Sequence, residues 1–260
     1  MGFVCDYPVV KPVSLDSDAV PGLGAFVSDY SKGAPYLSTK IIFILSGGSK
    51  REKDYFKPLK ADKMIRSIKI AFRSKNGQGL KPYELNALAA EFIKNKNFVT
   101  EDDKCYRIED EDIIYLLQDV DEFSIEVKKY LCDNATQSQY KWIVSNPSFE
   151  IWLFYHYFDT TELLEEGVRM SERDRSNWLK ERLNTIVSGG VKTTQALYGI
   201  ENAIANSSKN YVEENCFPKL YSTQMHIVAK SILSLMKSEF HDMKTRQEEK
   251  LEYYKRVNLK

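Results

Sequence analysis

Two carboxylates, Asp119 and Asp121, stand one residue apart directly after the apolar segment of residues 113–117. In extended backbone both side chains would point the same way, because side chains along a strand alternate between its two sides. Carboxylates held together repel each other, so one takes up a proton unless a cation is present. A hard divalent ion such as Mg²⁺ or Mn²⁺ relieves that repulsion, and phosphoryl-transfer enzymes hold metals in this way. The alternative is that the aspartates cap a helix expected to begin near Glu122.

A second candidate site follows the apolar segment of residues 41–45. Residues 46–49 read Ser-Gly-Gly-Ser, and Lys50 and Arg51 come next. Small residues leave backbone amides accessible, the N-terminus of the following helix adds positive potential, and two cations stand beside it. These features suit a phosphate group bound by Ser49, Lys50 and Arg51. A surface turn without a ligand is the alternative, and a loop that binds a free nucleotide is a third interpretation.

The two apolar segments contain no charged residue, which is typical of strands buried on both faces of a parallel sheet. Residues 64–72 and 140–144 are two further strand candidates. Helical patterns lie between the strands, and Pro82 and Pro147 each suit the first turn of a helix. Strands that alternate with helices predict an α/β fold with a mostly parallel, doubly wound sheet. Ligands of such sheets bind beyond the carboxyl ends of the strands, where both candidate sites are expected.

Three parts are expected along the chain. Residues 1–39 are rich in Pro, Gly, Ser and Asp and predict an irregular N-terminal arm. Residues 40–158 hold the alternation of strands and helices, with an acidic loop at 101–112. Residues 159–260 have a helical pattern, which predicts a helical C-terminal part packed on the core. Its last helix is expected from residue 223 to about 255, with a charged distal part that protrudes or contacts a partner.

Charge and cysteine content narrow the classes of function. Lys plus Arg and Asp plus Glu both number 37, so any nucleic-acid site must be a local patch. The four cysteines include no CxxC pair, which argues against a zinc finger and favours free thiols in the cytoplasm. No signal-peptide pattern or long apolar run is evident, so no membrane segment is expected. A nucleic-acid groove could be lined by Lys75, Lys81, Lys94 and Lys96, which otherwise lie on solvated helix faces.

Four segments together resemble one known family: residues 41–56, 119–122, 145–153 and 203–228. The third of them, Ser-Asn-Pro-Ser-Phe-Glu-Ile-Trp-Leu, is the most specific. On these segments the chain resembles the RloB-like family, which includes AbiLii-type abortive-infection proteins. That family is similar to the Toprim fold of topoisomerases, primases and OLD-type nucleases. The resemblance therefore implies a Toprim-like core over residues 40–158, with its sheet flanked by helices.

The resemblance also implies an activity, which is magnesium- or manganese-dependent cleavage of RNA or DNA in anti-phage defence. In that mechanism Asp119 and Asp121 hold the metal, Glu52 or Glu150 completes the site, and Lys50 or Arg51 steadies a phosphate. His226, within the fourth matching segment, is a further candidate site residue.

One departure from the family pattern leaves a second interpretation open. A Toprim site has a glutamate directly after its first strand, and this chain has Ser46 or Gly47 there. Neither residue can supply a carboxylate, although Glu52 matches the second glutamate of the family's loop. The site is therefore either altered but active, or degenerate in a subunit that binds nucleic acid or a partner without cutting. Members of the family are typically encoded beside an ATPase, so an AAA- or ABC-type ATPase partner is expected, and a homo-oligomer is possible.

Overall fold

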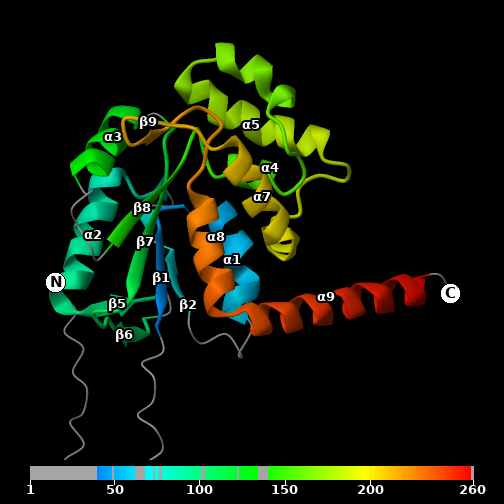
Figure 1. Ribbon diagram of the computed structural model, residues 1–260, viewed down its shortest axis with the longest axis horizontal. Helices are drawn as coiled ribbons and strands as arrows, with labels where there is room; N and C mark the ends of the chain where they lie inside the picture. The colour runs from blue at the N-terminus through cyan, green and yellow to red at the C-terminus, as the bar shows by residue number, and fades with distance from the viewer. Residues whose placement is uncertain are drawn as a thin grey trace, which may run out of the picture. The chain divides into compact units, whose positions relative to one another are not determined.

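The central element is a parallel sheet made of β1 (Ile42–Ser46), β2 (Ile68–Phe72), β7 (Ile113–Asp119) and β8 (Tyr140–Ser145). Its four strands lie in the order β2-β1-β7-β8 (Figure 1). The computed structural model describes residues 40–48, 50–61, 68–72, 74–75, 78–100, 103–121, 123–133 and 140–258. The expected N-terminal arm, Ser49 and the first residues of the 64–72 strand candidate lie outside this part of the chain. Because β1 and β7 are parallel neighbours, the segments that follow them leave the sheet at the same edge.

Helices cover both faces of this sheet, which confirms the predicted α/β fold. On one face lie α1 (Arg51–Ala61) and α8 (Met225–Leu235), and on the other lie α2 (Pro82–Asn95) and α3 (Ser124–Asp133) (Figure 1). Pro82 occupies the first turn of α2, as predicted, because a proline there lacks only an amide that the helix would leave unpaired.

Side chains of β1 alternate between two hydrophobic clusters, as expected of a strand buried on both faces. Ile42 and Ile44 belong to the cluster under α1 and α8, and Phe43 and Leu45 to the cluster under α2 and α3. Phe43 is completely buried, and burying such a side chain stabilises the fold by about 1.5–3 kcal/mol.

The segment predicted as an acidic loop, residues 101–112, instead contains half of a hairpin. Strand β5 (Asn97–Val99) pairs with antiparallel β6 (Cys105–Arg107). The hairpin forms because Phe98 is fully buried, with its ring 4.6 Å from the ring of Phe43. The prediction of a loop rests on the acidic residues of 101–112 and does not consider Phe98, which lies just before them. The other short hairpins are β3 (Ser74–Lys75) with β4 (Gln78–Gly79) and β9 (Glu213–Glu214) with β10 (Phe217–Pro218).

Pro147 lies outside any first helical turn, contrary to the prediction. The next helix, α4 (Glu150–Phe154), begins three residues later. The backbone around Pro147 is used for other hydrogen bonds: the amide of Asp121 donates to its carbonyl at 2.9 Å, and the amide of Asn146 donates to the carbonyl of Ser222 at 3.0 Å. This segment therefore ties the end of β7 to the C-terminal part of the chain.

The C-terminal part is helical, as expected. Its elements before α8 are η2 (Glu162–Arg169), α5 (Glu172–Ile186), α6 (Thr193–Ala196), η3 (Leu197–Gly199) and α7 (Ile200–Asn210). The predicted single last helix is two helices, α8 and α9 (Lys237–Asn258), separated at Met236, whose φ is −143°. The break lets Ile232 before it and Phe240 after it enter the same hydrophobic cluster.

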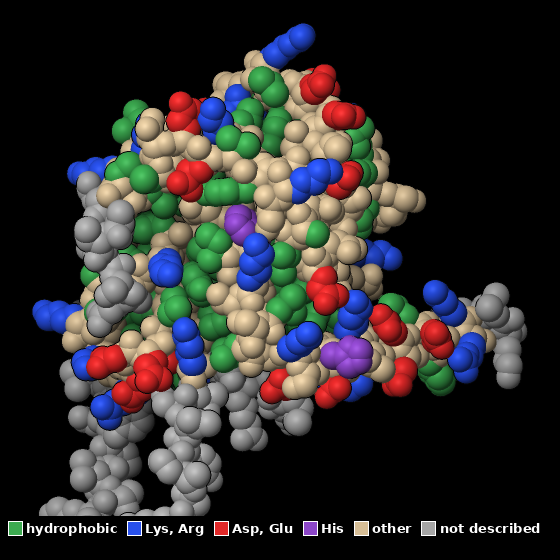
Figure 2. Space-filling view, viewed as in Figure 1, with side chains coloured by type: hydrophobic (Ala, Val, Ile, Leu, Met, Phe, Trp, Pro, Cys, Tyr) green, Lys and Arg blue, Asp and Glu red, His purple; other side chains and the backbone are tan. Residues whose placement is uncertain are grey.

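Charged side chains of both signs lie along α9 (Figure 2). Phe240 and Met243 near its start are buried, whereas Leu251, Tyr253, Tyr254 and Val257 are exposed.

Residues 40–260 group into one unit by their contacts, and the boundary expected near residue 158 stays a prediction. Among the described helices, none has the length and apolarity to span a membrane.

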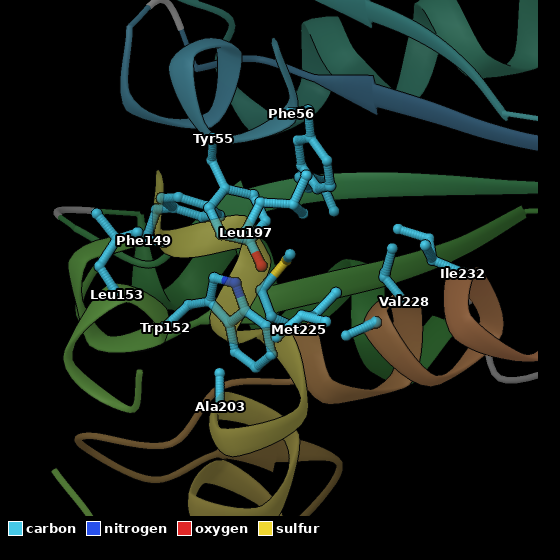
Figure 3. Close-up of a cluster of buried hydrophobic side chains, with 14 of the residues drawn as sticks. Tyr55, Phe56, Phe149, Trp152, Leu153, Leu197, Ala203, Met225, Val228 and Ile232 are labelled. Atoms are coloured by element: carbon cyan, nitrogen blue, oxygen red, sulfur yellow. The ribbon is translucent and has the colours of Figure 1, made fainter. Parts of the chain in front are cut away.

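Aromatic residues of α1 and α4 meet in the larger hydrophobic cluster (Figure 3). The ring of Tyr55 lies edge-on to Phe149 at 5.5 Å and to Trp152 at 6.3 Å. Its hydroxyl is 3.2 Å from the Nε2 of His156. Burial lowers the pKa of His156 to about 4, so this histidine is neutral and satisfied inside the core. These contacts fix the start of α4, and hence Glu150, against α1.

Candidate functional site

A cleft of about 480 Å³ opens at the carboxyl edge of the sheet. Segments far apart in the chain form its walls: the turns after β1 and β7, the β4–α2 junction, the start of α4, and α5. Its lining consists of Gly47, Gly48, Lys50, Arg51, Glu52, Gly79, Leu80, Lys81, Leu117, Gln118, Asp119, Asp121, Phe123, Phe149, Glu150 and Lys180. The two sites that the sequence singles out separately are thus two walls of one cleft.

Glu52 lies in the first turn of α1 and is largely buried, with 8% of its surface exposed. Its carboxylate folds back over the backbone of Gly48, where a Cβ atom would come within 2.0 Å of the Glu52 Cδ. Only glycine leaves room for this arrangement. Burial raises the pKa of Glu52 to about 7, and repulsion by Glu150 and Asp121 acts in the same direction. A hydrogen bond with its own backbone and the nearby Lys180 oppose the shift.

Asp119 is the last residue of β7. Burial raises its pKa well above the ordinary range, and repulsion by Glu52, Asp121 and Glu150 adds to the effect. Lys180 opposes these contributions. Lys180 alone does not offset this repulsion at Asp119, so a proton or a further cation beside Asp119 would stabilise the site.

Asp121 reaches the cleft differently from the prediction. Strand β7 ends at Asp119, and Asp121 has a left-handed backbone with φ of 37°. The predicted alternation along an extended strand is therefore wrong for this pair. A turn orients Asp121 instead, held by the hydrogen bond from its amide to Pro147 and by the hydroxyl of Ser176, which donates to its Oδ1. Helix α3 begins at Ser124, so Asp121 is not its N-cap residue either.

Glu150, at the start of α4, is 1% exposed and faces Arg51. The Nε of Arg51 is 3.6 Å from the Glu150 Oε1, and its Nη1 donates to the Thr193 hydroxyl at 3.3 Å. Since 3.6 Å exceeds hydrogen-bond distance, Oε1 is buried with no hydrogen-bond partner among the described residues. Arg51 thus balances the charge of Glu150 while leaving a carboxylate oxygen unsatisfied at the cleft wall.

The loop after β1 is only partly as expected. Lys50 and Arg51 line the cleft. The amide of Gly48 already donates to the Ser46 hydroxyl at 3.0 Å, and the Gly47 carbonyl accepts from the Leu80 amide at 3.1 Å. The Gly48 amide is therefore occupied, and the side chains that bring positive charge from this segment to the cleft are those of Lys50 and Arg51.

Two cleft residues follow from no motif in the sequence. Lys180 lies on α5, some distance along the chain from the other site residues, and acts on the pKa of both Glu52 and Asp119. Gln118 donates from Nε2 to the Asp119 carbonyl at 3.0 Å. Lys81, one of the four lysines considered for a groove, does line the cleft, whereas Lys94 and Lys96 do not.

His226 is not brought to the cleft. Its Nδ1 lies 2.9 Å from the Thr223 carbonyl, and its ring packs edge-on against Tyr211 at 5.1 Å. Burial lowers its pKa. These contacts give His226 a structural position at the start of α8.

The donor chemistry of the cleft suits a hard divalent cation, because it offers crowded carboxylates and an unsatisfied Glu150 oxygen. Nowhere in the described part of the chain do three or more His, Cys, Asp or Glu side chains converge closely enough to hold one ion together. Mg²⁺, however, is usually bound by one or two carboxylates plus water and substrate phosphate. The residues therefore fit a metal that is shared with a substrate, and do not fit a closed all-protein site.

Comparison with known families gave a match over most of the chain: a model described as RloB-like protein covers residues 42–232. The matched range runs from the start of β1 into α8 and includes every residue that lines the cleft. Neither the curated proteins nor the solved structures that were compared gave a significant match.

Proposed function

The chain belongs to the RloB-like protein family, and we propose that it is a metal-dependent nuclease that cleaves RNA or DNA in anti-phage defence. The observation that carries the proposal is the gathering of four carboxylates, Glu52, Asp119, Asp121 and Glu150, in one cleft at the carboxyl edge of a parallel sheet. Ligands bind such sheets at this edge. The defence role rests on the likeness of the family to abortive-infection proteins.

In the proposed mechanism Asp119 and Asp121 would hold Mg²⁺ or Mn²⁺ together with a phosphate of the substrate. Such an ion would supply Lewis-acid stabilisation of the charge that develops on the phosphoryl group. Lys50, Lys81 and Lys180 bring positive charge to the cleft and position the backbone of the nucleic acid. Arg51 keeps Glu150 in place and contributes to the same positive wall.

Glu52 is the residue best suited to move a proton. Burial raises its pKa to about 7 in the metal-free cleft, and a divalent ion bound beside it would lower that pKa again, so Glu52 would be available as a general base in the metal-loaded site. It therefore takes the role of the glutamate that Toprim sites place directly after the first strand, where this chain has Ser46 and Gly47.

The test is cleavage of tRNA, single-stranded DNA and plasmid by the purified chain with Mg²⁺ or Mn²⁺, alone and with the ATPase encoded nearby. Replacing both metal-site aspartates (Asp119→Asn plus Asp121→Asn) should reduce cleavage at least a thousandfold. Glu181→Gln is the matched control, because Glu181 is an exposed acid on α5 one residue from Lys180 and outside the cleft. Equal cleavage by the double variant and the wild type would refute the nuclease proposal.

A catalytically degenerate subunit is the second candidate, favoured by one observation. At the position of the missing glutamate, Ser46 is fully buried and its hydroxyl accepts a hydrogen bond from Gly48, so it has a structural task. Such a subunit would bind nucleic acid or its ATPase partner without cutting. It predicts nucleic-acid binding that is unchanged by EDTA, no cleavage under any metal, and full phage protection by the double aspartate variant.

A further inference from the structure

A smaller pocket adjoins the cleft and has no task in the proposed cleavage. It has a volume of about 230 Å³ and is lined by Asp121, Phe123, Arg173, Ser176, Asn177 and Lys180. Asp121, Phe123 and Lys180 also line the cleft, so these three residues form the boundary between the two spaces. We call this space the side pocket.

The side pocket combines three kinds of group that recognise a nucleobase. Phe123 is half-buried: part of its side chain packs on the hydrophobic cluster under α2 and α3, and the remainder lines both spaces. Arg173 and Asn177 are exposed on α5. An aromatic ring or a guanidinium plane stacks on any base, and an amide can both donate to and accept from a base edge.

The size of the side pocket limits what can enter it. Pockets for drug-sized ligands are about 300–1,000 Å³, and 230 Å³ is below that range. One flat base fits this limit better than a whole nucleotide or a base pair. A base inside a duplex would have its faces covered by its neighbours and its edge covered by its partner, so only an unpaired base could enter.

The wall between the two spaces is held firmly in place. Ser176, 5% exposed, donates its hydroxyl to Asp121, which joins α5 to the turn after β7. A base in the side pocket would therefore lie directly beside the carboxylate that faces the phosphate in the cleft. In a nucleic acid, the base and the phosphate of one nucleotide are neighbours in the same way.

We propose that the side pocket binds one unpaired base next to the phosphate held in the cleft, which makes single-stranded RNA or DNA the substrate class. The inference rests on the proposed function, because that proposal puts the phosphate in the cleft. Phe123 provides the stacking surface, and Arg173 and Asn177 contact the plane and the edge of the base. Duplex nucleic acid would reach the lysines through its phosphates only.

The experiment measures binding by fluorescence anisotropy with Ca²⁺ in place of Mg²⁺, because Ca²⁺ also binds carboxylate oxygens but has a looser coordination geometry, and a gel confirms that the probes stay uncut. The probes are a labelled 12-nucleotide single strand of mixed sequence, as DNA and as RNA, and the matching blunt duplexes. Phe123→Leu should weaken single-strand binding about tenfold, because base–aromatic stacking is lost while apolar packing is kept. Phe123→Tyr should restore binding to within about twofold. Asn177→Ala, an exposed substitution that leaves the fold intact, should weaken single-strand binding about threefold.

Duplex binding should change less than twofold in all three variants. The proposal is overturned if the wild type does not bind the single strands, if Phe123→Leu binds them as the wild type does, or if duplex binding falls by the same factor. A Phe123→Leu chain that fails to fold leaves Asn177→Ala to decide by the same criteria. If the variants change single-strand binding as expected but the wild type never cleaves, then the side pocket binds a base and the nuclease proposal fails. If the wild type cleaves and Phe123→Leu cleaves at the same rate, then the nuclease proposal stands and the proposed role of the side pocket fails.

Discussion

At the scale of single residues, the position of Glu52 depends on a glycine four residues before it. A Cβ atom at Gly48 would lie 1.9 Å from the Glu52 Oε1, so any other residue displaces the carboxylate. We therefore expect Gly48→Ala to reduce cleavage at least tenfold while the chain stays folded. The matched control is Gly199→Ala, since the nearest atom to a Cβ there is 3.7 Å away, on His156. Normal cleavage by Gly48→Ala would show that Glu52 does not need its present position.

The raised pKa of Glu52 makes stability depend on pH in a defined direction. Its pKa is about 7 in the folded chain and 4.5 as the ordinary value, so between these values the folded state binds more protons than the unfolded state. Stability therefore falls as the pH rises from 4.5 through 7, by up to about 3 kcal/mol from this group. Asp119, with its pKa also raised, acts in the same direction.

Glu52→Gln should flatten this pH dependence and make the chain more stable than the wild type at pH 8. Urea unfolding between pH 5 and pH 8 in EDTA measures it. Glu181→Gln again serves as the control, since an exposed acid should not alter the slope. His156 and His226, whose pKa values are lowered by burial, act in the opposite direction below pH 6.5, so the difference between the two curves is what decides. A gap between Glu52→Gln and the wild type that does not widen from pH 5 to pH 8 would contradict the assignment.

At the scale of elements, helix α5 supplies the wall that completes the cleft. The Ser176 hydroxyl bonded to Asp121 is its direct link to the turn after β7. Ser176→Ala should cost about 1.5 kcal/mol, because the acceptor is a charged group, and lower the melting temperature by about 3 °C. Cleavage should fall as well, since Asp121 loses its restraint.

Ser208→Ala is the matched control for that substitution. The Ser208 hydroxyl, on α7, is buried with no hydrogen-bond partner among the described residues, so its removal should be neutral or slightly stabilising. Differential scanning calorimetry compares the two variants. An equal melting temperature for both would show that the link from α5 to Asp121 contributes nothing to stability.

The elements that sequence patterns predict well are those whose burial is complete. Strands β1 and β7 are recognisable because both faces of each are covered, so their apolar runs are continuous. Local chemistry also locates the start of α2 at Pro82. Sequence patterns do not predict the turn at Asp121, the hairpin around Phe98 or the break at Met236. Contacts with distant segments hold the turn and the hairpin, and residues on both sides of the break pack in one hydrophobic cluster.

The residues of the candidate site likewise divide into those that local sequence patterns predict and those that depend on distant contacts. Residues directly after β1 and β7 could be predicted, because the carboxyl ends of parallel neighbours share an edge. Lys180 could not be predicted as a site residue. The apolar pattern of α5 shows that the helix packs on another element, but it does not show that the helix borders this cleft. Side-chain packing between distant helices carries that information, and no spacing within the sequence encodes it.

At the scale of the whole molecule, the basic and acidic residues are equal in number, but charged side chains gather in two places. The cleft collects four acids and a group of cations, and the distal half of α9 presents charged side chains of both signs together with exposed aromatic residues (Figure 2). Tyr253 is 63% exposed and Tyr254 is 51% exposed. Exposed aromatic residues on a charged helix are typical of a surface that binds a protein partner. We propose that this half of α9 docks a protein partner, and that the partner is an ATPase of the kind the family resemblance implies.

Ending the chain at Gln247 tests this assignment, because residues 248–257 are all exposed and none contributes to either hydrophobic cluster. The melting temperature should change by less than about 2 °C, whereas binding to the proposed ATPase partner in a purified pull-down should be lost. Tyr253→Ser plus Tyr254→Ser keeps the helix and should weaken the same binding at least tenfold. Sedimentation velocity on both variants separates this outcome from self-association: if the truncated chain changes from a dimer to a monomer but still binds the ATPase, then the surface joins two copies of the chain and the ATPase docks elsewhere.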